Sequence, residues 1–262
     1  MKCLILILGE SFRTGSQGSR IKGRQDSYDE QNKACNSHID FFNFLEKKYN
    51  LDISVSLLSY QTIFEEDLKN IYSKYIIKYE ILNNTIGLDG LFHRSYSNID
   101  INNYNFILYF RIDIYLKKYF YKIFNPHWNT IRFATILWTK YKLCGIYPPT
   151  NDIVIFIPKI YFNYLSKINL NSHCSTWKGL LDNNLHINDL DTMLDTFHDT
   201  DSEKDLNPLY YIVNRPKQTI WHDKNLIFNK YTFPKSNSFN NKYIYYIVLF
   251  ITVLFILIKK LI

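Results

Sequence analysis

Continuous apolar runs and segments of helical period alternate along most of this chain. The run at 3–8 is apolar throughout and predicts a buried first strand. A polar loop at 9–27 follows, and residues 29–49 then carry apolar side chains at near-helical spacing. Strand, loop and helix in this order open a βαβ unit. The pattern therefore predicts an α/β fold with a parallel sheet.

The segments up to residue 215 extend this pattern. The run at 105–114 is apolar at nearly every position, which is typical of a central strand covered on both faces. Further strands are expected at 51–58, 131–138 and 152–157, and further helices at 63–78, 115–124, 159–167 and 190–197. Residues 80–103 are polar and poorly periodic, and 209–213 fit either a strand or a helix. We therefore expect one α/β domain over 1–215, a single Rossmann-like sheet flanked by helices.

The C-terminal part differs from this domain. Residues 216–242 are rich in Asn, Lys and Ser and predict a polar linker. Residues 243–258 form an apolar run that would span about 24 Å as a helix, slightly less than the ~30 Å hydrocarbon core. Terminal lysines can snorkel to make up the difference. We therefore expect a transmembrane anchor over 243–262. A buried core helix stays open as the alternative, although such a helix normally has a polar face.

The expected location follows from the two apolar ends of the chain. The N-terminal run at 3–8 is shorter than the hydrophobic region of a signal peptide. A single-pass protein held in the lipid bilayer by its C-terminus, with its domain in the cytosol, is the simplest topology. Lysines flank both ends of 243–258, so loop charge does not decide the orientation.

Charge and cysteine content narrow the choice of partners. The formal net charge is +7, but a basic N-terminal loop and an acidic stretch at 189–205 mix the signs along the chain. A general nucleic-acid binder would instead carry a basic face, so no nucleic-acid partner is expected. Phosphate groups of a small ligand, or an anionic membrane, suit the excess of basic side chains. The four cysteines lack C-x-x-C spacing, which favours reduced thiols over a zinc site or disulfides.

The loop after the first strand combines glycines with two arginines. Gly9, Gly15 and Gly18 allow close backbone approach to a ligand, and Arg13 and Arg20 can bind phosphate oxygens. The loop is neither a Walker A motif nor a G-x-G-x-x-G fingerprint. It therefore indicates either a phosphate-binding loop or a solvated surface loop.

Arg111 and Asp113 end the central apolar run and lie on one face of the strand. Charges in an apolar strand need compensation, which at a strand's carboxyl end is often a ligand or a metal ion. An internal ion pair between the two side chains is the alternative.

Two further positions carry candidate chemistry. His198, with Asp199 or Asp201, offers ligands that suit Mn²⁺ or Mg²⁺, or a histidine–carboxylate acid–base pair. A solvated acidic face or a helix cap would explain the same segment. Asp152, after a proline-containing turn, could bind an acceptor hydroxyl or act as a base, and an Asn-Asp turn is the alternative.

Taken together, four segments resemble glycosyltransferase-like proteins encoded by large DNA viruses and some microbes. They are Gly9–Arg13, Phe106–Asp113, Asn151–Lys159 and His198–Arg215. The resemblance implies a GT-A-like fold, in which the loop after the first strand holds a nucleotide and an acidic motif holds a divalent metal ion on the sugar-diphosphate.

The acidic motif of that family is only partly present. Arg111 replaces its first carboxylate, so Arg111 could neutralise the diphosphate directly in place of a metal ion. The resemblance further implies that Asp113 and His198 are diphosphate or metal contacts and that Asp152 lies on the acceptor side.

These expectations lead to two competing hypotheses of function. The first is a membrane-anchored enzyme that moves a sugar from a nucleotide-sugar to a hydroxyl group of a glycan or protein acceptor. Arg13 and Arg20 would lie near the nucleotide phosphates and Arg111 and Asp113 at the diphosphate. The competitor is a non-catalytic, single-pass membrane interaction protein that retains the fold.

Overall fold

The computed structural model describes residues 1–12, 25–84, 86–134, 136–137, 153–170, 175–193, 197–198 and 209–213. Within these residues a seven-stranded sheet has the order β3-β2-β1-β4-β8-β6-β9. Its strands are β1 (Lys2–Gly9), β2 (Asp52–Tyr60), β3 (Ile76–Leu82), β4 (Phe106–Arg111), β6 (Ile131–Phe133), β8 (Val154–Pro158) and β9 (Leu190–Thr192). The sheet confirms the predicted α/β class, although it is mixed rather than wholly parallel.

Most of the sheet is parallel. β3, β2, β1 and β4 run in one direction, whereas β8 is antiparallel to both of its neighbours, β4 and β6. β9 is parallel to β6. Because β1 and β4 lie in the middle and are covered on both faces, their sequences are apolar at nearly every position.

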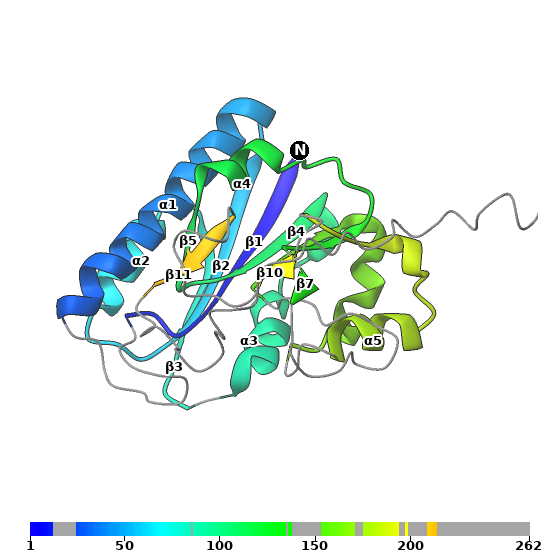
Figure 1. The fold of residues 1–262 in the computed structure, drawn as a ribbon. Coiled ribbons are helices and arrows are strands. Elements are labelled where there is room, and N and C mark those ends of the chain that lie inside the picture. The colour runs from blue at the N-terminus through cyan, green and yellow to red at the C-terminus, as the bar shows by residue number, and fades with distance from the viewer. Residues whose placement is uncertain are drawn as a thin grey trace, which may run out of the picture. The chain divides into compact units, whose positions relative to one another are not determined.

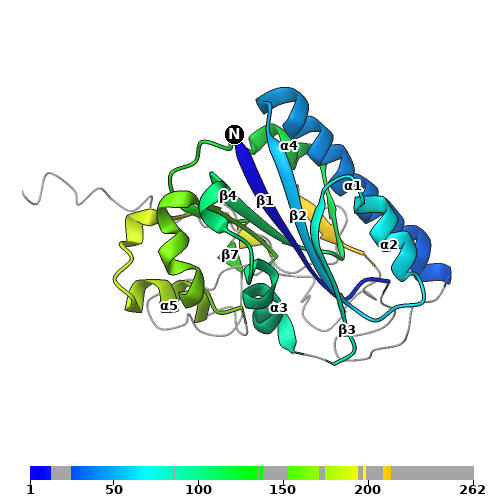
Figure 2. The same ribbon diagram turned by 180° about the vertical axis from the view of Figure 1, so that it is seen from behind.

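Helices cover both faces of the sheet (Figures 1 and 2). Cys3, Ile5 and Ile7 of β1 belong to the core that also contains apolar side chains of α1 (Gln25–Tyr49), α2 (Glu65–Tyr72) and α4 (Lys118–Ile123). Leu4, Leu6 and Leu8 belong to the opposite core, with α3 (Gly87–Tyr96), the 3₁₀ helix η2 (Lys159–Lys167) and α5 (Ser175–Asp182). Alternate side chains of β1 thus pack against helices on opposite faces of the sheet.

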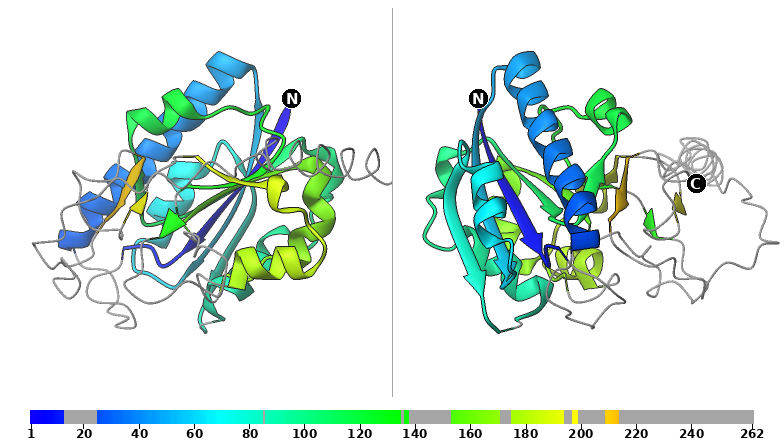
Figure 3. Two further views of the ribbon diagram at one scale, coloured as in Figure 1. Left: turned by 45° about the vertical axis from the view of Figure 1, so that its right-hand side comes forward. Right: turned by 90° about the vertical axis from the view of Figure 1, so that its left-hand side faces the viewer.

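Smaller elements extend the fold beside the main sheet. Two 3₁₀ turns are η1 (Ile101–Asn103) and η3 (Ile187–Asp189). β5 (Ile114–Leu116) pairs antiparallel with β11 (Tyr210–Ile212), which Figure 3 shows beside it. β7 (Ile136–Leu137) pairs in parallel with β10 (Phe197–His198). The 209–213 segment is therefore a strand, one of its two predicted states.

Several predicted elements are confirmed. The runs at 3–8 and 51–58 are β1 and β2, and the 29–49 segment is α1, which begins four residues earlier at Gln25. α1 ends at Tyr49, and the next residue, Asn50, has a φ of 51°, the left-handed conformation that closes many helices. The central run at 105–114 is strand β4 up to Arg111, followed by a turn and β5.

Other predicted elements are wrong in extent or type. The helix expected at 63–78 ends at Tyr72, and β3 begins at Ile76. The polar 80–103 segment contains α3, and 159–167 is a 3₁₀ rather than an α-helix. The helix expected at 190–197 is wrong, because Leu190 and Thr192 are buried on either side of a more exposed Asp191, the period of a strand.

The membrane prediction concerns residues outside the described part of the chain. The linker at 216–242 and the apolar run at 243–258 both lie there. Among the helices that are described, none is both long and apolar enough to cross a bilayer.

Candidate functional site

The strand order reverses between β1 and β4. From β1 the chain passes through α1 to β2 and through α2 to β3, moving along the sheet in one direction. It then returns through α3, on the other face, to β4 on the far side of β1. In open α/β sheets, ligands bind outside the carboxyl ends of the strands at such a reversal. The segments after Gly9 and after Phe110 therefore form the candidate site.

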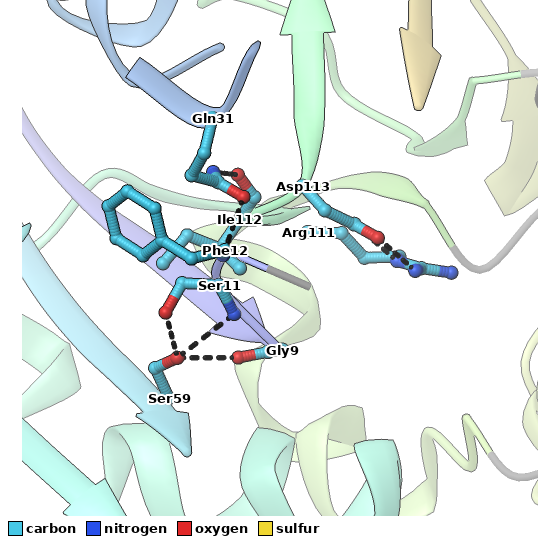
Figure 4. A network of polar contacts seen from close by, with 8 residues as sticks. All are labelled: Gly9, Ser11, Phe12, Gln31, Ser59, Arg111, Ile112 and Asp113. Carbon is cyan, nitrogen blue, oxygen red and sulfur yellow. Dashed lines mark hydrogen bonds and ion pairs between the residues drawn. The ribbon is translucent and has the colours of Figure 1, made fainter. Parts of the chain in front are cut away.

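Hydrogen bonds fix the chain where it leaves β1 (Figure 4). The Ser59 hydroxyl, at the end of β2, donates to the Gly9 carbonyl oxygen at 2.8 Å and accepts from the Ser11 amide at 3.3 Å. Since the single Ser59 proton is used on Gly9, the Ser11 hydroxyl donates in the 3.0 Å contact between the two side chains. Gly9 itself has a φ of 126°, a conformation that other residues adopt only with strain.

Phe12 forms a second, strained corner. Its φ of 53° is unusual for a bulky residue. The Phe12 amide donates to the Gln31 side-chain oxygen at 3.1 Å, and the Ser27 hydroxyl donates to the Phe12 carbonyl oxygen at 3.0 Å. The Phe12 ring packs on Tyr28 and Phe64, with centroids 5.5 and 4.9 Å away. Backbone strain of this kind persists only where surrounding contacts enforce it, and such strain clusters at functional sites.

Arg111 and Asp113 form a two-pronged ion pair at the end of β4. The Arg111 Nε donates to Asp113 Oδ1 at 2.9 Å, and its Nη2 donates to Oδ2 at 2.6 Å. The Asp113 side chain is 4% exposed and that of Arg111 is 14% exposed. The internal ion pair, which the sequence left open as the alternative, is therefore present. Its arginine still reaches the surface at the carboxyl edge of the sheet.

Gln31 of α1 ties the two segments together (Figure 4). Its side-chain oxygen accepts from the Phe12 amide, and its Nε2 donates to the Ile112 carbonyl oxygen at 2.8 Å. The Ile112 amide in turn donates to the Leu8 carbonyl oxygen at 2.9 Å. A fully buried amide thus holds the backbone just before Arg13 against the backbone between Arg111 and Asp113.

A buried polar chain continues from Gln31 along α1. Nε2 of Gln31 lies 3.6 Å from the Cys35 sulfur, and His38 follows one turn later. His38 Nε2 lies 2.7 Å from the Ile114 carbonyl oxygen, so this nitrogen carries the proton and donates. Nδ1 then accepts from the Tyr72 hydroxyl at 2.6 Å. His38 is thus a structural residue, and burial lowers its pKa from 6.5 to about 3.

The low pKa of His38 predicts a loss of stability in acid. Between about pH 6.5 and 3 the unfolded chain protonates His38 and the folded chain does not. The free energy of unfolding should therefore fall as the pH drops through this window, by up to ~1.4 kcal/mol per pH unit from this residue. Denaturant titrations of wild type and His38→Gln between pH 7 and 4 measure this fall in the free energy of unfolding. The His38→Gln variant should show the shallower slope of unfolding free energy against pH. Equal slopes for wild type and His38→Gln would contradict this.

The predicted site residues divide into three groups. Arg111 and Asp113 lie together at the carboxyl edge, next to the corner at Gly9–Phe12. Arg13, Arg20 and Asp152 lie outside the described residues. The backbone of His198 is the second residue of β10, paired with Leu137 in the small separate sheet. The roles of these residues stay predictions.

The described residues do not fit the expected divalent metal ion. Both carboxylate oxygens of Asp113 accept hydrogen bonds from Arg111, so a cation would have to displace the guanidinium. In the described part of the chain, no three His, Cys, Asp or Glu side chains gather as a metal site. Among the described residues, Arg111 places a positive charge at this edge.

Sequence reasoning missed the residues that hold the site. Ser11 lay within the predicted loop, but Ser59 ends a strand and Gln31 lies on a helix, with no motif around either. One signal was available: Gln31 interrupts the face of α1 that also carries Ala34, Cys35 and His38. A long polar residue on a buried helix face needs partners of its own.

Comparisons with known proteins find only partial structural similarity at low sequence identity. No family model and no curated protein matches the sequence. Among solved structures, the inositol-1-phosphate CTP transferase from T. maritima is 10% identical and has a TM-score of 0.45, with 73% of this chain and 84% of that chain covered.

Two further solved structures are glycosyltransferases. One is involved in glycosylation of the major capsid of PBCV-1 (9% identity, 62% of each chain, TM-score 0.30). The other is the galactosyltransferase LgtC in complex with donor and acceptor sugar analogues (10% identity, 73% of each chain, TM-score 0.35).

Proposed function

We propose that the protein is a GT-A-like glycosyltransferase that binds a nucleotide-sugar outside the carboxyl ends of β1 and β4. The observation that supports this most is the reversal of strand order between these strands, with a partly exposed arginine at the reversal. The strained, hydrogen-bonded corner at Gly9–Phe12 leads into the arginine-containing loop on the same edge. Both features suit a phosphorylated ligand.

Arg111 would bind the diphosphate of the donor. A guanidinium presents five N–H donors in a fixed plane and keeps its charge at all working pH values. Asp113 uses two of these donors and so fixes the orientation of the plane. As the bond between the sugar and the diphosphate breaks, negative charge grows on the leaving oxygen, and a preorganised cation stabilises it. Asp113 acts here as a positioning residue.

The rest of the reaction involves residues known from sequence alone. Arg13 and Arg20 would add phosphate contacts from the loop after β1. The acceptor hydroxyl oxygen forms the new bond to the sugar, the nucleoside diphosphate leaves with the old bonding pair, and Asp152 takes the hydroxyl proton. His198 would contact the diphosphate from the 198–215 segment. The acceptor would be a glycan or a protein hydroxyl.

Nucleotide binding should not require a divalent metal ion, because Arg111 occupies the carboxylate that would hold one. UDP, GDP, CDP and ADP, and the corresponding sugar nucleotides, are titrated into the full chain while its melting temperature is followed. At least one should raise the melting temperature equally with Mn²⁺ and with EDTA. A shift seen only with Mn²⁺ would contradict the arginine role. No shift with any nucleotide would favour the non-catalytic interaction protein.

Membrane attachment is a separate proposal that rests on the sequence pattern of 243–262. The apolar run would anchor the protein in a bilayer by its C-terminus, with the 1–215 domain in the cytosol. Expressed in cells, the full chain should stay with membranes after alkaline carbonate washing, and a chain ending at residue 242 should not. Release of the full chain by carbonate would exclude the anchor.

A further inference from the structure

A polar groove lies between α1 and α2, outside the transfer site. Its volume is about 240 Å³. Four of its lining residues are spaced to face the neighbouring helix, Asn32 and Asn36 from α1 and Asp67 and Asn70 from α2. Tyr28 and Ile71 complete the lining. Packing does not explain this polar stripe, since aromatic contacts such as Phe42 with Tyr72 already join the two helices.

The polar side chains of the groove lack partners within the described part of the protein. Asn36 and Asn70 are exposed, and Asn32 and Asp67 are partly buried. None of these four side chains makes a hydrogen bond or ion pair with a described residue. The side-chain oxygen of Asn32 is also buried from solvent without a partner. Buried polar atoms are nearly always hydrogen-bonded to protein, water or a ligand, so the Asn32 oxygen is available to a hydroxyl donor that enters the groove.

We propose that this groove binds a neutral sugar unit. A hydroxyl group both donates and accepts, and so does an amide, so three asparagines match a ligand that carries several hydroxyls. Asp67 accepts further hydroxyl protons and, as the only charged group among the described lining residues, disfavours phosphorylated or acidic ligands. The volume is below the ~300–1,000 Å³ of usual small-molecule sites, which suits a single ring.

The position of the groove connects it with the transfer site. Tyr28, which lines the groove, stacks on Phe12 with ring centroids 5.5 Å apart. Phe12 is the strained corner of the loop that leaves β1. A sugar in the groove therefore lies beside this corner, where it would hold a distal unit of the acceptor glycan. This last assignment rests on the proposed function, whereas sugar binding itself does not.

Saturation-transfer NMR on the full chain tests the groove directly. The probes are glucose, galactose, mannose and N-acetylglucosamine, with glucose 6-phosphate as the charged comparison and Gly-Gly-Gly as the peptide comparison. At least one neutral sugar should receive saturation, and more than either comparison ligand. Asp67→Asn removes a charged acceptor, and Asn32→Ala removes an amide from the lining, so each should weaken binding of that sugar about tenfold.

The matched control is Glu66→Gln, which makes the same charge change on the neighbouring, exposed position of α2. It should leave sugar affinity unchanged, and thermal melting shows whether each variant is folded. Absence of transfer to every sugar, stronger transfer to the peptide, or equal weakening by Glu66→Gln would overturn the proposal. Sugar binding in a protein that binds no nucleotide would refute the proposed transferase and leave the groove standing.

Discussion

Replacing Arg111 by Met, or Asp113 by Leu, should each lower the free energy of unfolding by about 3–5 kcal/mol, because each leaves a largely buried charge without its ion-pair partner. The double variant, Arg111→Met with Asp113→Leu, should recover most of this loss, since apolar side chains of similar volume often replace a buried ion pair at little cost. Urea titrations of the four proteins give these energies.

Nucleotide affinity in the same four proteins should not recover in the double variant, although its stability does. The double variant should still bind the nucleotide at least tenfold more weakly than wild type, because the charged donors for the diphosphate are gone. Arg94→Met, which breaks the ion pair between exposed Arg94 and partly buried Glu80, is the control and should change both quantities much less. A double variant that is stable and binds nucleotide like wild type would show that the Arg111/Asp113 pair is purely structural.

Gln31→Met should destabilise the protein by about 2–5 kcal/mol. The substitution keeps the length of the side chain but leaves two buried backbone groups, the Phe12 amide and the Ile112 carbonyl, without their partner, at about 1–3 kcal/mol each. Urea titration measures the loss. Gln61→Met, at an exposed position, is the matched control and should be nearly neutral.

Gln31→Glu adds a test through its pH dependence. At neutral pH the introduced carboxylate would face the Ile112 carbonyl oxygen, whereas the protonated carboxylic acid could donate to it. The introduced carboxyl group should therefore have a raised pKa, and its penalty should shrink as the pH falls. Gln31→Met and Gln31→Glu variants as stable as wild type at pH 7 would contradict the role of Gln31 as a tie.

The central strands were predictable because burial on both faces requires apolar residues at nearly every position. β1 and β4 are covered on both faces, so nearly every position is apolar and the runs stand out. α1 was equally clear, since 25 residues give many turns of helical period. Long elements with a strong pattern thus carried the prediction of an α/β sheet.

Short elements were not predictable from local pattern. β9 has three residues, and its type is decided by pairing with β6 rather than by its own sequence. β3 is an edge strand whose side chains are nearly all partly buried, so it lacks the apolar run of a central strand and merged with α2 in the prediction. Tertiary context overrode local periodicity in both places.

The candidate site was predictable only in its charged residues. Arg111 and Asp113 stand out because charge is rare at the end of an apolar run, but the sequence did not distinguish an ion pair from ligand contacts. The tie through Gln31 joins residues 19 and 81 positions away, and such pairings follow from the folded sheet alone. Local spacing therefore could not reveal it.

The most direct measurement is a crystal structure of the protein with the nucleoside diphosphate that raises its melting temperature most. The diphosphate should lie outside the carboxyl ends of β1 and β4, with an oxygen within hydrogen-bond distance of the Arg111 guanidinium. A nucleotide bound elsewhere, with Arg111 contacting only Asp113, would contradict the account.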